Sequence, residues 1–400
     1  MVSKTQQRAI EQEQNVCAHN YKPLPVVLAR GRGAWLWDVD GNRYLDMMSA
    51  YSAVSHGHSH PRLMEALACQ SQRLAIPSRA FYNDQLAPLL EKICTLSGLD
   101  MALPMNTGAE AVETAIKAAR RWGYEVKNIP RDEAEIIVAD NNFHGRTTTI
   151  VGFSSSEDAR RDFGPFAPGF TAIPFGDADA LEKAITPNTC AFLVEPIQGE
   201  AGIIVPPQGW LEKVAAICRK NNVLLILDEI QSGLGRTGKM FAYQHENIQP
   251  DGLILGKALG GGMMPVSCFV GRREILDLFG PGSHGSTFGG NPLAAAVGLE
   301  ALKVLEEEKL VQRSAELGDY LMEKLAALNT PLFENIRGRG LWVGVDVDSS
   351  HISAGALCAK LLEKGVLAKE TQENTIRFAP PLVITRDEID WGVRQLEACL

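Results

Sequence analysis

The chain has 400 residues, 45% of them hydrophobic, and its 48 acidic and 39 basic residues give a formal net charge of −9. This length is ample for a large core and indicates two domains, or one large domain with appendages. The acidic excess argues against a general nucleic-acid binder, so we expect small molecules and further copies of the chain as partners. Eight scattered cysteines without a C-x-x-C pair, no apolar run of membrane-spanning length and no visible targeting peptide predict a cytoplasmic protein with reduced thiols.

The expected elements differ between the middle of the chain and its ends. Residues 26–48 predict a hairpin that turns at Asp40-Gly41. From about residue 100 to 290, short apolar runs alternate with helical stretches. The expected strands are Glu135–Ala139, Thr171–Pro174, Ala191–Val194, Val223–Leu227, Gly252–Gly256 and Val266–Val270, and the expected helices are Ala109–Trp122, Trp210–Asn221 and Pro292–Glu308. Residues 310–400 predict two helices, with strands near Gly340–Val345 and Thr375–Phe378.

This pattern predicts an α/β fold with a mainly parallel sheet covered by helices. The simplest assembly is a large domain over residues 46–294. Residues 1–45 and 295–400 would together form a smaller α+β domain.

Two neighbouring strand ends carry the most informative side chains. The apolar run Val223–Leu227 stops at Asp228, and the run Leu253–Gly256 stops at Lys257. In open α/β sheets, ligands bind beyond the carboxyl ends of the strands. Pyridoxal phosphate (PLP) needs such a pair, with a lysine to form a Schiff base and an acid to keep the ring nitrogen protonated.

Two glycine patterns offer competing interpretations. Gly256-Lys257 resembles the end of a phosphate loop, but the first glycine comes one residue late at Gly252 and Ala258 replaces the hydroxyl residue. Gly233–Gly238 matches G-x-G-x-x-G, yet Asp228–Ser232 separate it from the preceding strand and no convincing helix follows. A nicotinamide dehydrogenase would rest on this second pattern alone.

Further polar residues follow other predicted strands or begin helices. Asn106–Glu110 introduces a helix whose free N–H groups suit a phosphate. Phe143 can stack on a planar ring, and Arg146 can clamp a carboxylate. Glu195 and Glu200 bring more acid to the same edge of the sheet.

The remaining candidates are a loop, a cation and a histidine cluster. The loop Gly285–Gly290 can also hold phosphate, and Arg377 is a cation in an otherwise apolar strand. His56, His58 and His60 alternate, but the nearby acids lack metal-ligand spacing, so we expect no metal.

Taken together, these residues make the chain resemble the class-III, fold-type-I PLP aminotransferases. The resemblance runs from NYKPLPV at Asn20 to RFAPPLVIT at Arg377, and DEIQSGLGRTG, LGKALGGG and GSTFGGNP are its most specific stretches. It implies a PLP-dependent transferase fold, in which the large domain holds a mainly parallel seven-stranded sheet.

The resemblance also implies a role for each matched residue. Lys257 would form the Schiff base and Asp228 would pair with the pyridine nitrogen. The other cofactor contacts would come from Gln231 at the ring hydroxyl, Phe143 stacked on the ring, Gly108 and Ala109 at the phosphate, and Thr287 at the phosphate of the neighbouring subunit's cofactor. A homodimer with shared active sites follows. Tyr21, Tyr51, Arg146, Glu200 and Arg377 would line the substrate pocket.

Within the class, the resemblance points to the branch that moves the δ-amino group of ornithine to 2-oxoglutarate, in proline and arginine metabolism. It suggests that Glu200 masks Arg377 when ornithine binds and releases it for glutamate. Enzymes acting on N-acetylornithine or 4-aminobutyrate, and a non-catalytic relative, are the alternatives. One departure is His144, where relatives commonly carry Trp.

Overall fold

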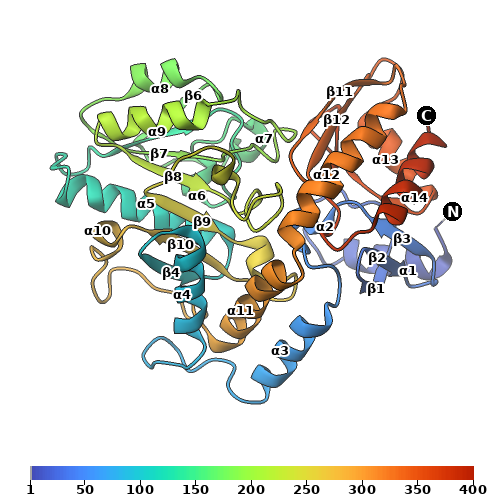
Figure 1. Ribbon diagram of the computed structural model, residues 1–400, viewed down its shortest axis with the longest axis horizontal. Coiled ribbons are helices and arrows are strands. Elements are labelled where there is room, and N and C mark those ends of the chain that lie inside the picture. Colours follow the sequence, from blue (N-terminus) through green and yellow to red (C-terminus); the bar gives the residue numbers. More distant parts are fainter. Residues whose placement is uncertain (1) are drawn as a thin grey trace.

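The computed structural model describes residues 2–400, which form one large sheet and two smaller ones (Figure 1). Within these residues the large sheet has seven strands in the order β4-β10-β9-β8-β7-β5-β6. Their bounds are β4 (Met101–Met105), β10 (Ser267–Gly271), β9 (Gly252–Leu255), β8 (Leu224–Asp228), β7 (Thr189–Val194), β5 (Glu135–Ala139) and β6 (Phe170–Ile173). Strands β9, β8, β7, β5 and β6 run parallel, whereas β10 is antiparallel to both of its neighbours.

Helices cover both faces of this sheet, which explains why its strands read as continuous apolar runs. Leu224 and Ile226 of β8 point toward α5 (Gly108–Glu125), in one apolar cluster. Leu225 and Leu227 point to the opposite face, in the cluster that also contains residues of α9 (Trp210–Lys220). The alternation of the two clusters along one strand fixes which face each side chain occupies.

The other helices of the central region flank the sheet or join its strands. They are α3 (Pro61–Ser71), α4 (Leu86–Ser97), α6 (Thr148–Val151), α7 (Glu157–Arg160), α8 (Ala178–Ala184), α10 (Arg273–Leu276), α11 (Pro292–Glu307) and the 3₁₀ turns η1 (Ala242–His245) and η2 (Lys257–Gly260).

The two ends of the chain meet in the smaller part of the molecule, on the right of Figure 1. One sheet has the order β1-β2-β3-β13 and the other β11-β12-β15-β14. Their bounds are β1 (Leu28–Arg32), β2 (Trp35–Asp38), β3 (Arg43–Asp46), β13 (Val366–Leu367), β11 (Phe333–Gly338), β12 (Val343–Val347), β15 (Thr375–Phe378) and β14 (Lys369–Thr371), and the helices are α1 (Lys4–Gln14), α2 (Ser49–Ser52), α12 (Leu310–Ala327), α13 (Ala354–Glu363) and α14 (Arg386–Glu397). Because β13 pairs with β3, N- and C-terminal segments share a sheet.

The predicted elements are present, and their ends lie within three residues of the predicted positions. The hairpin joins β2 to β3, and Gly41 has a φ of 88° in its turn. The features that were not predicted include β4, the antiparallel direction of β10, and a third helix within 310–400. Helical and strand periods do not reveal strand direction, which depends on how distant segments pair.

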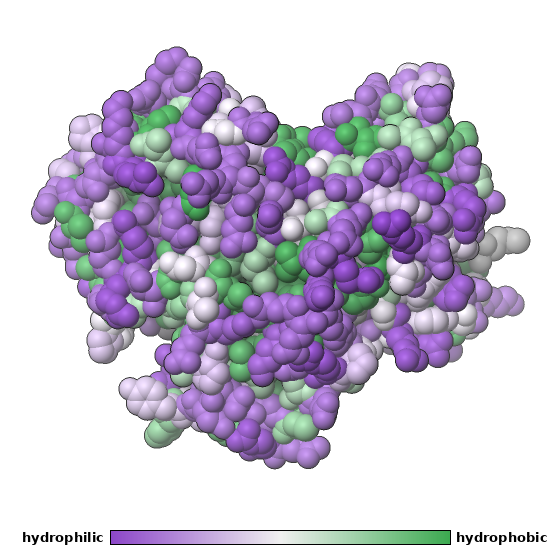
Figure 2. Space-filling model, viewed as in Figure 1, coloured by the Kyte–Doolittle hydropathy of each residue, from purple (hydrophilic) through white to green (hydrophobic). Residues whose placement is uncertain are grey.

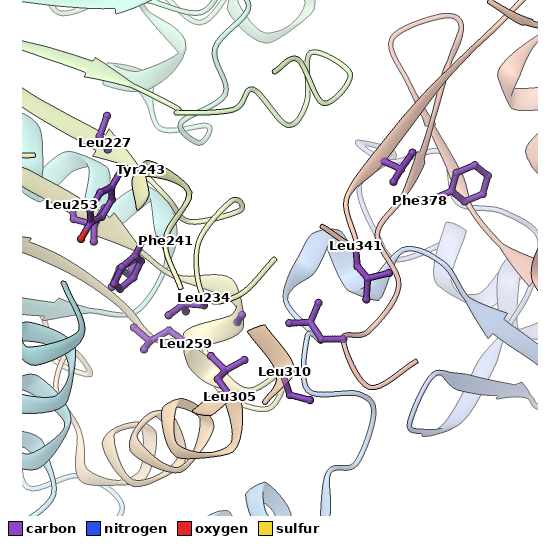
Figure 3. Close-up of a cluster of buried hydrophobic side chains, with 14 of the residues drawn as sticks. Leu227, Leu234, Phe241, Tyr243, Leu253, Leu259, Leu305, Leu310, Leu341 and Phe378 are labelled. Atoms are coloured by element: carbon purple, nitrogen blue, oxygen red, sulfur yellow. The ribbon is translucent and has the colours of Figure 1, made fainter. Parts of the chain in front are cut away.

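The apolar core is continuous between the large sheet and the smaller part. Figure 3 shows Leu227, Leu253 and Phe241 on the sheet side, with Leu341 and Phe378 across from them, and all belong to one cluster of buried residues. Helix α11 crosses the expected boundary at residue 294 and packs against α3 and α4. The division into residues 46–294 and the two terminal segments therefore stays a prediction.

Candidate active site

Asp228 and Lys257 lie at the carboxyl ends of the adjacent strands β8 and β9, as the sequence predicts. Asp228 is the last residue of β8 and is buried. Lys257 follows β9 at the first position of η2, with a φ of 45°. A positive φ is uncommon for a residue with a side chain and often marks a functional site.

Both side chains face a cavity of about 200 Å³ at this edge of the sheet. Six of the seven residues expected to contact the cofactor line it. The lining residues are Gly108, Ala109, Phe143, His144, Gly145, Glu195, Ile197, Asp228, Ile230, Gln231, Ser232 and Lys257. The cavity thus combines an amine, two carboxylates, an aromatic ring and a helix start.

His144 holds the Asp228 carboxylate in place. Its Nδ1 lies 2.6 Å from Asp228 Oδ2, while the backbone N–H of Ile230 donates to Asp228 Oδ1 at 3.0 Å. Burial opposes protonation of His144, but the hydrogen bond and negative charge of Asp228 outweigh it and raise the pKa of His144 above its usual 6.5. The other ring nitrogen, Nε2, is buried without a hydrogen-bond partner among residues 2–400.

Glu195 supplies a second buried carboxyl group beside this pair. It accepts hydrogen bonds from the backbone N–H groups of Phe143 at 3.0 Å and Gly199 at 3.3 Å. Burial raises the pKa of Glu195 to about 7, although the nearby His144 acts in the opposite direction. The carboxyl therefore fixes the backbone that carries Phe143, whose ring lines the cavity.

The amine of Lys257 is tuned for proton transfer. Burial lowers its pKa to about 8, against a raising effect of Glu200 and a further lowering by Arg377. A lysine with this pKa is part neutral near neutral pH, so it can act as a nucleophile or a base.

The start of α5 also lines the cavity. Thr107 caps this helix, and the Glu110 carboxylate accepts from the Thr107 backbone N–H in a capping box. The first N–H groups of a helix have no partner inside it, so those of Gly108 and Ala109 are available to an anion. A Cβ at Gly108 would lie 2.9 Å from Ile230 Cδ1, so a larger residue there would displace the end of the Ile230 side chain.

A second cavity, of about 290 Å³, adjoins the first and contains two of the expected substrate residues. Arg146 and Glu200 line it, and Phe143, His144 and Gly145 belong to both cavities. Among residues 2–400 no carboxylate lies within ion-pair distance of Arg146, and its guanidinium lies 5.6 Å from the centre of the Phe143 ring.

Arg377 and Glu200 form an ion pair. Arg377 Nη1 donates to Glu200 Oε1 at 2.5 Å, and Arg377 is buried in β15. The Tyr51 ring covers the same guanidinium, 5.1 Å from ring centre to carbon. Three of the five expected substrate residues therefore form one contact group.

Four expected residues line neither cavity in this single chain. Tyr51 and Arg377 are nevertheless joined to the second cavity through Glu200, whereas Tyr21 and Thr287 are not. The Tyr21 side chain is 77% exposed, and Thr287 is exposed in the loop between α10 and α11. Neither makes a hydrogen bond to the cavity residues within residues 2–400. Their assignments stay predictions, and for Thr287 the prediction itself places the contact on a second subunit.

Comparison with known proteins identifies the family. A family model described as "Aminotransferase class-III" matches residues 16–400. The chain belongs to the class-III aminotransferases. It is 60% identical to ornithine aminotransferase of Geobacillus sp. (strain WCH70) over 380 residues, 95% of each chain. Among solved structures, it resembles ornithine aminotransferase of Toxoplasma gondii (TM-score 0.97, 46% identity, 99% and 94% covered) and acetylornithine aminotransferase of Elizabethkingia anophelis (TM-score 0.90, 48% identity, 99% of each covered).

Class-III aminotransferases use PLP, and the first cavity fits that cofactor. Asp228 offers a carboxylate for the ring nitrogen, the start of α5 offers free N–H groups for the phosphate, and Lys257 offers an amine for covalent attachment. The fold type and the PLP-dependent aminotransferase class expected from the sequence are confirmed.

The roles of His144 and Glu195 in this site were recognised only from the structure. The sequence showed His144 only as a departure from the family and Glu195 only as additional acid. The bond of His144 to Asp228 and that of Glu195 to the Phe143 N–H depend on the folded chain.

Within residues 2–400 no cluster of three or more His, Cys, Asp or Glu side chains could hold a metal ion, and no helix is long and apolar enough to cross a membrane.

Proposed function

We propose that this aminotransferase transfers the δ-amino group of ornithine to 2-oxoglutarate and forms glutamate 5-semialdehyde and glutamate. The near full-length likeness to ornithine aminotransferases of several bacteria supports this substrate. Within the site, the observation that carries it is the ion pair of Glu200 with Arg377, near an Arg146 that has no carboxylate partner among residues 2–400.

This charge pattern suits two substrates that bind by different ends. Ornithine presents a positive α-amino group, which an Arg377 not paired with Glu200 would repel. With Glu200 paired to Arg377 that repulsion is neutralised, and Arg146 can bind the α-carboxylate of ornithine. When glutamate binds, Arg377 exchanges Glu200 for the α-carboxylate while Arg146 takes the γ-carboxylate.

The chemistry divides between the cofactor and the protein. When bound, PLP supplies an electron sink for the electron pair left on the substrate carbon after proton removal. Lys257 would take that proton from the substrate carbon and deliver it to the cofactor carbon next to the shared nitrogen. Its lowered pKa makes the amine a base near neutral pH. Asp228, fixed by His144, would keep the ring nitrogen protonated, and Gln231 lies on the same wall.

The remaining roles follow the same division. Phe143 would stack on the ring, and Gly108 with Ala109 would bind the phosphate. Tyr21 and Tyr51 would meet the α-amino end of ornithine. Thr287 would reach the phosphate of the neighbouring subunit's cofactor, so the working unit is a homodimer. The described cysteines are all free thiols, which suits the reducing cytoplasm.

An amine-donor panel tests the substrate assignment. Purified enzyme loaded with PLP is given 2-oxoglutarate and one of ornithine, N-acetylornithine or 4-aminobutyrate, and glutamate formation is followed. Ornithine should be the preferred donor, and glutamate 5-semialdehyde should be its product. Equal or better use of N-acetylornithine would reject the proposed substrate and leave the aminotransferase family intact.

A further inference from the structure

The segment that carries Tyr51 has an unusual backbone. Ser49, Ala50, Tyr51 and Ser52 have φ values of 43°, 48°, 58° and 72°, so α2 is a left-handed turn of four residues with side chains. Single residues visit this region occasionally, but consecutive non-glycine residues do so rarely, because Cβ approaches the following carbonyl oxygen. Such a turn persists only where its surroundings fix it.

Strand β15 and the residues after it provide part of that support. The Ser49 hydroxyl donates to the Ala379 carbonyl at 2.6 Å, and the Ala379 N–H donates to the Met47 carbonyl at 2.7 Å. The Leu382 N–H donates to the Ser55 carbonyl at 2.8 Å. The turn is thereby bound to the segment that begins two residues after Arg377.

Arg236 completes the support from the large sheet's side. Its Nη1 donates to the carbonyls of Pro380 at 2.6 Å and Leu341 at 2.9 Å. Its Nη2 donates to the hydroxyls of Ser49 at 3.2 Å and Ser55 at 3.0 Å. One guanidinium therefore joins both sides of the left-handed turn to the strand end that follows Arg377.

The burial of this arginine is itself unusual. Arg236 is 0% exposed, and within residues 2–400 no carboxylate lies in ion-pair distance of it. Burial lowers the pKa of Arg236 to about 9, opposed by the charge of Asp46. Charged groups are rarely buried without an opposite charge, so a purely packing role would be served better by an apolar side chain.

Arg236 comes from the Gly233–Gly238 loop, which matches a dinucleotide motif in letters alone. Leu234 and Gly235 have φ values of 54° and 89°, and the Arg236 carbonyl accepts from Ser314 Oγ at 2.8 Å. The loop thus turns the arginine inward, between the large sheet and the smaller part of the molecule. Figure 3 shows the neighbouring Leu234 and Leu341 on the two sides of this junction.

We propose that Arg236 is a positioning residue for substrate recognition: by holding the left-handed turn Ser49–Ser52 and the strand end at Pro380 together, it sets Tyr51 over Arg377. The inference deepens the proposed function, since Arg377 there receives a substrate carboxylate. Arg236 lines neither cavity, so it acts only by placing Tyr51 over Arg377.

The experiment measures binding of glutarate, a dicarboxylate that cannot react, to the PLP-loaded enzyme, together with KM and kcat for ornithine. Arg236→Lys keeps the charge but loses the planar fork that reaches four acceptors. We expect the glutarate Kd and the ornithine KM to rise about tenfold while kcat changes less than about threefold.

A double-mutant cycle separates positioning from general loosening. If Arg236 acts through Tyr51, Arg236→Lys should weaken glutarate binding less than about twofold in a Tyr51→Ala background. Independent, multiplicative losses in the double variant would overturn the proposal. Ser55→Ala, which removes one of the two hydroxyl acceptors, should shift Kd in the same direction by a smaller factor and provides the test if Arg236→Lys does not fold.

Arg313→Lys is the matched control. Arg313 donates to the carbonyls of Leu382, Val383 and Ile384 on the same segment but makes no hydrogen bond to residues 49–55 in the described chain. It should leave glutarate binding unchanged, and an equal loss would overturn the proposal. Failure of the proposed function would show separately, as a parent enzyme that binds glutarate but does not use ornithine.

Discussion

The cofactor cavity and the substrate contact group are built in different ways. The cavity's polar residues extend from the ends of β5, β7, β8 and β9, and its two carboxyl groups are fixed by hydrogen bonds within that one sheet edge. The substrate group joins Glu200 to Tyr51 and Arg377, which come from the smaller part of the chain and meet it across a junction. Figure 2 shows a notch between these two parts of the molecule, with apolar residues near its floor.

This difference separates fixed chemistry from adjustable recognition. Proton transfer requires groups held in one geometry, which a rigid sheet edge supplies. A site that accepts two unlike substrates instead requires one charge to change partners, and the Glu200–Arg377 pair can open without disturbing the sheet. Substitutions on the two sides should therefore have different kinetic consequences.

The largest effect is expected at the sheet edge, at Lys257. Lys257→Ala removes both the covalent attachment and the base, so transamination should fall by at least about 10⁴-fold. PLP should still bind noncovalently, because Asp228, Phe143 and the start of α5 are retained. Borohydride reduction followed by peptide mapping checks the assignment in the parent, and label on any other lysine would contradict it.

Removing His144 should act on stability as well as on chemistry. His144→Phe leaves the buried Asp228 carboxylate without its partner, so the apoenzyme should lose about 3 kcal/mol of unfolding free energy in urea titrations. Because the folded pKa of His144 is raised, this contribution is full below pH 6.5 and declines as pH rises through the folded pKa. A loss that grows with pH would contradict the pairing.

The substrate side should show unequal effects instead. Glu200→Ala exposes Arg377 to the α-amino end of ornithine but leaves both arginine clamps for glutamate. We expect the ratio of the single-turnover rate constant to Kd to fall about tenfold for ornithine and less than about threefold for glutamate. Equal losses with both substrates would remove the exchange of partners from the account.

The smallest effect is expected at Tyr21, which is exposed in the single chain. Tyr21→Ile should reduce the preference for ornithine over N-acetylornithine and 4-aminobutyrate by roughly three- to tenfold, because a hydroxyl partner of the charged α-amino group is lost. The donor panel measures this. A variant with unchanged preferences would place Tyr21 outside the site.

The sequence predicted the sheet edge better than the junction. Asp228 and Lys257 each end an apolar run, so their meeting follows from the rule that parallel strands end at one edge. The hydrogen bond of His144 to Asp228 joins residues 84 positions apart, and no local pattern encodes it. Resemblance to the family, rather than periodicity, supplied Gln231, Thr287 and the two tyrosines.

The left-handed turn at Ser49–Ser52 shows the limit most clearly. Its residues are not glycines, so nothing in the local sequence predicts four positive φ values. The conformation depends on Arg236 and Ala379, which are distant in sequence. Likewise, the sequence context of Gly233–Gly238 argued against a dinucleotide motif. Only the structure revealed that this loop turns Arg236 inward.

The most direct test of the central claim is a pair of crystal structures of the PLP-loaded Lys257→Ala variant, one with ornithine and one with glutamate. With ornithine, Glu200 should remain paired to Arg377 while Arg146 binds the α-carboxylate. With glutamate, Arg377 should leave Glu200 and bind the α-carboxylate. An ornithine carboxylate bound to Arg377, or an unbroken Glu200–Arg377 pair with glutamate, would contradict the account.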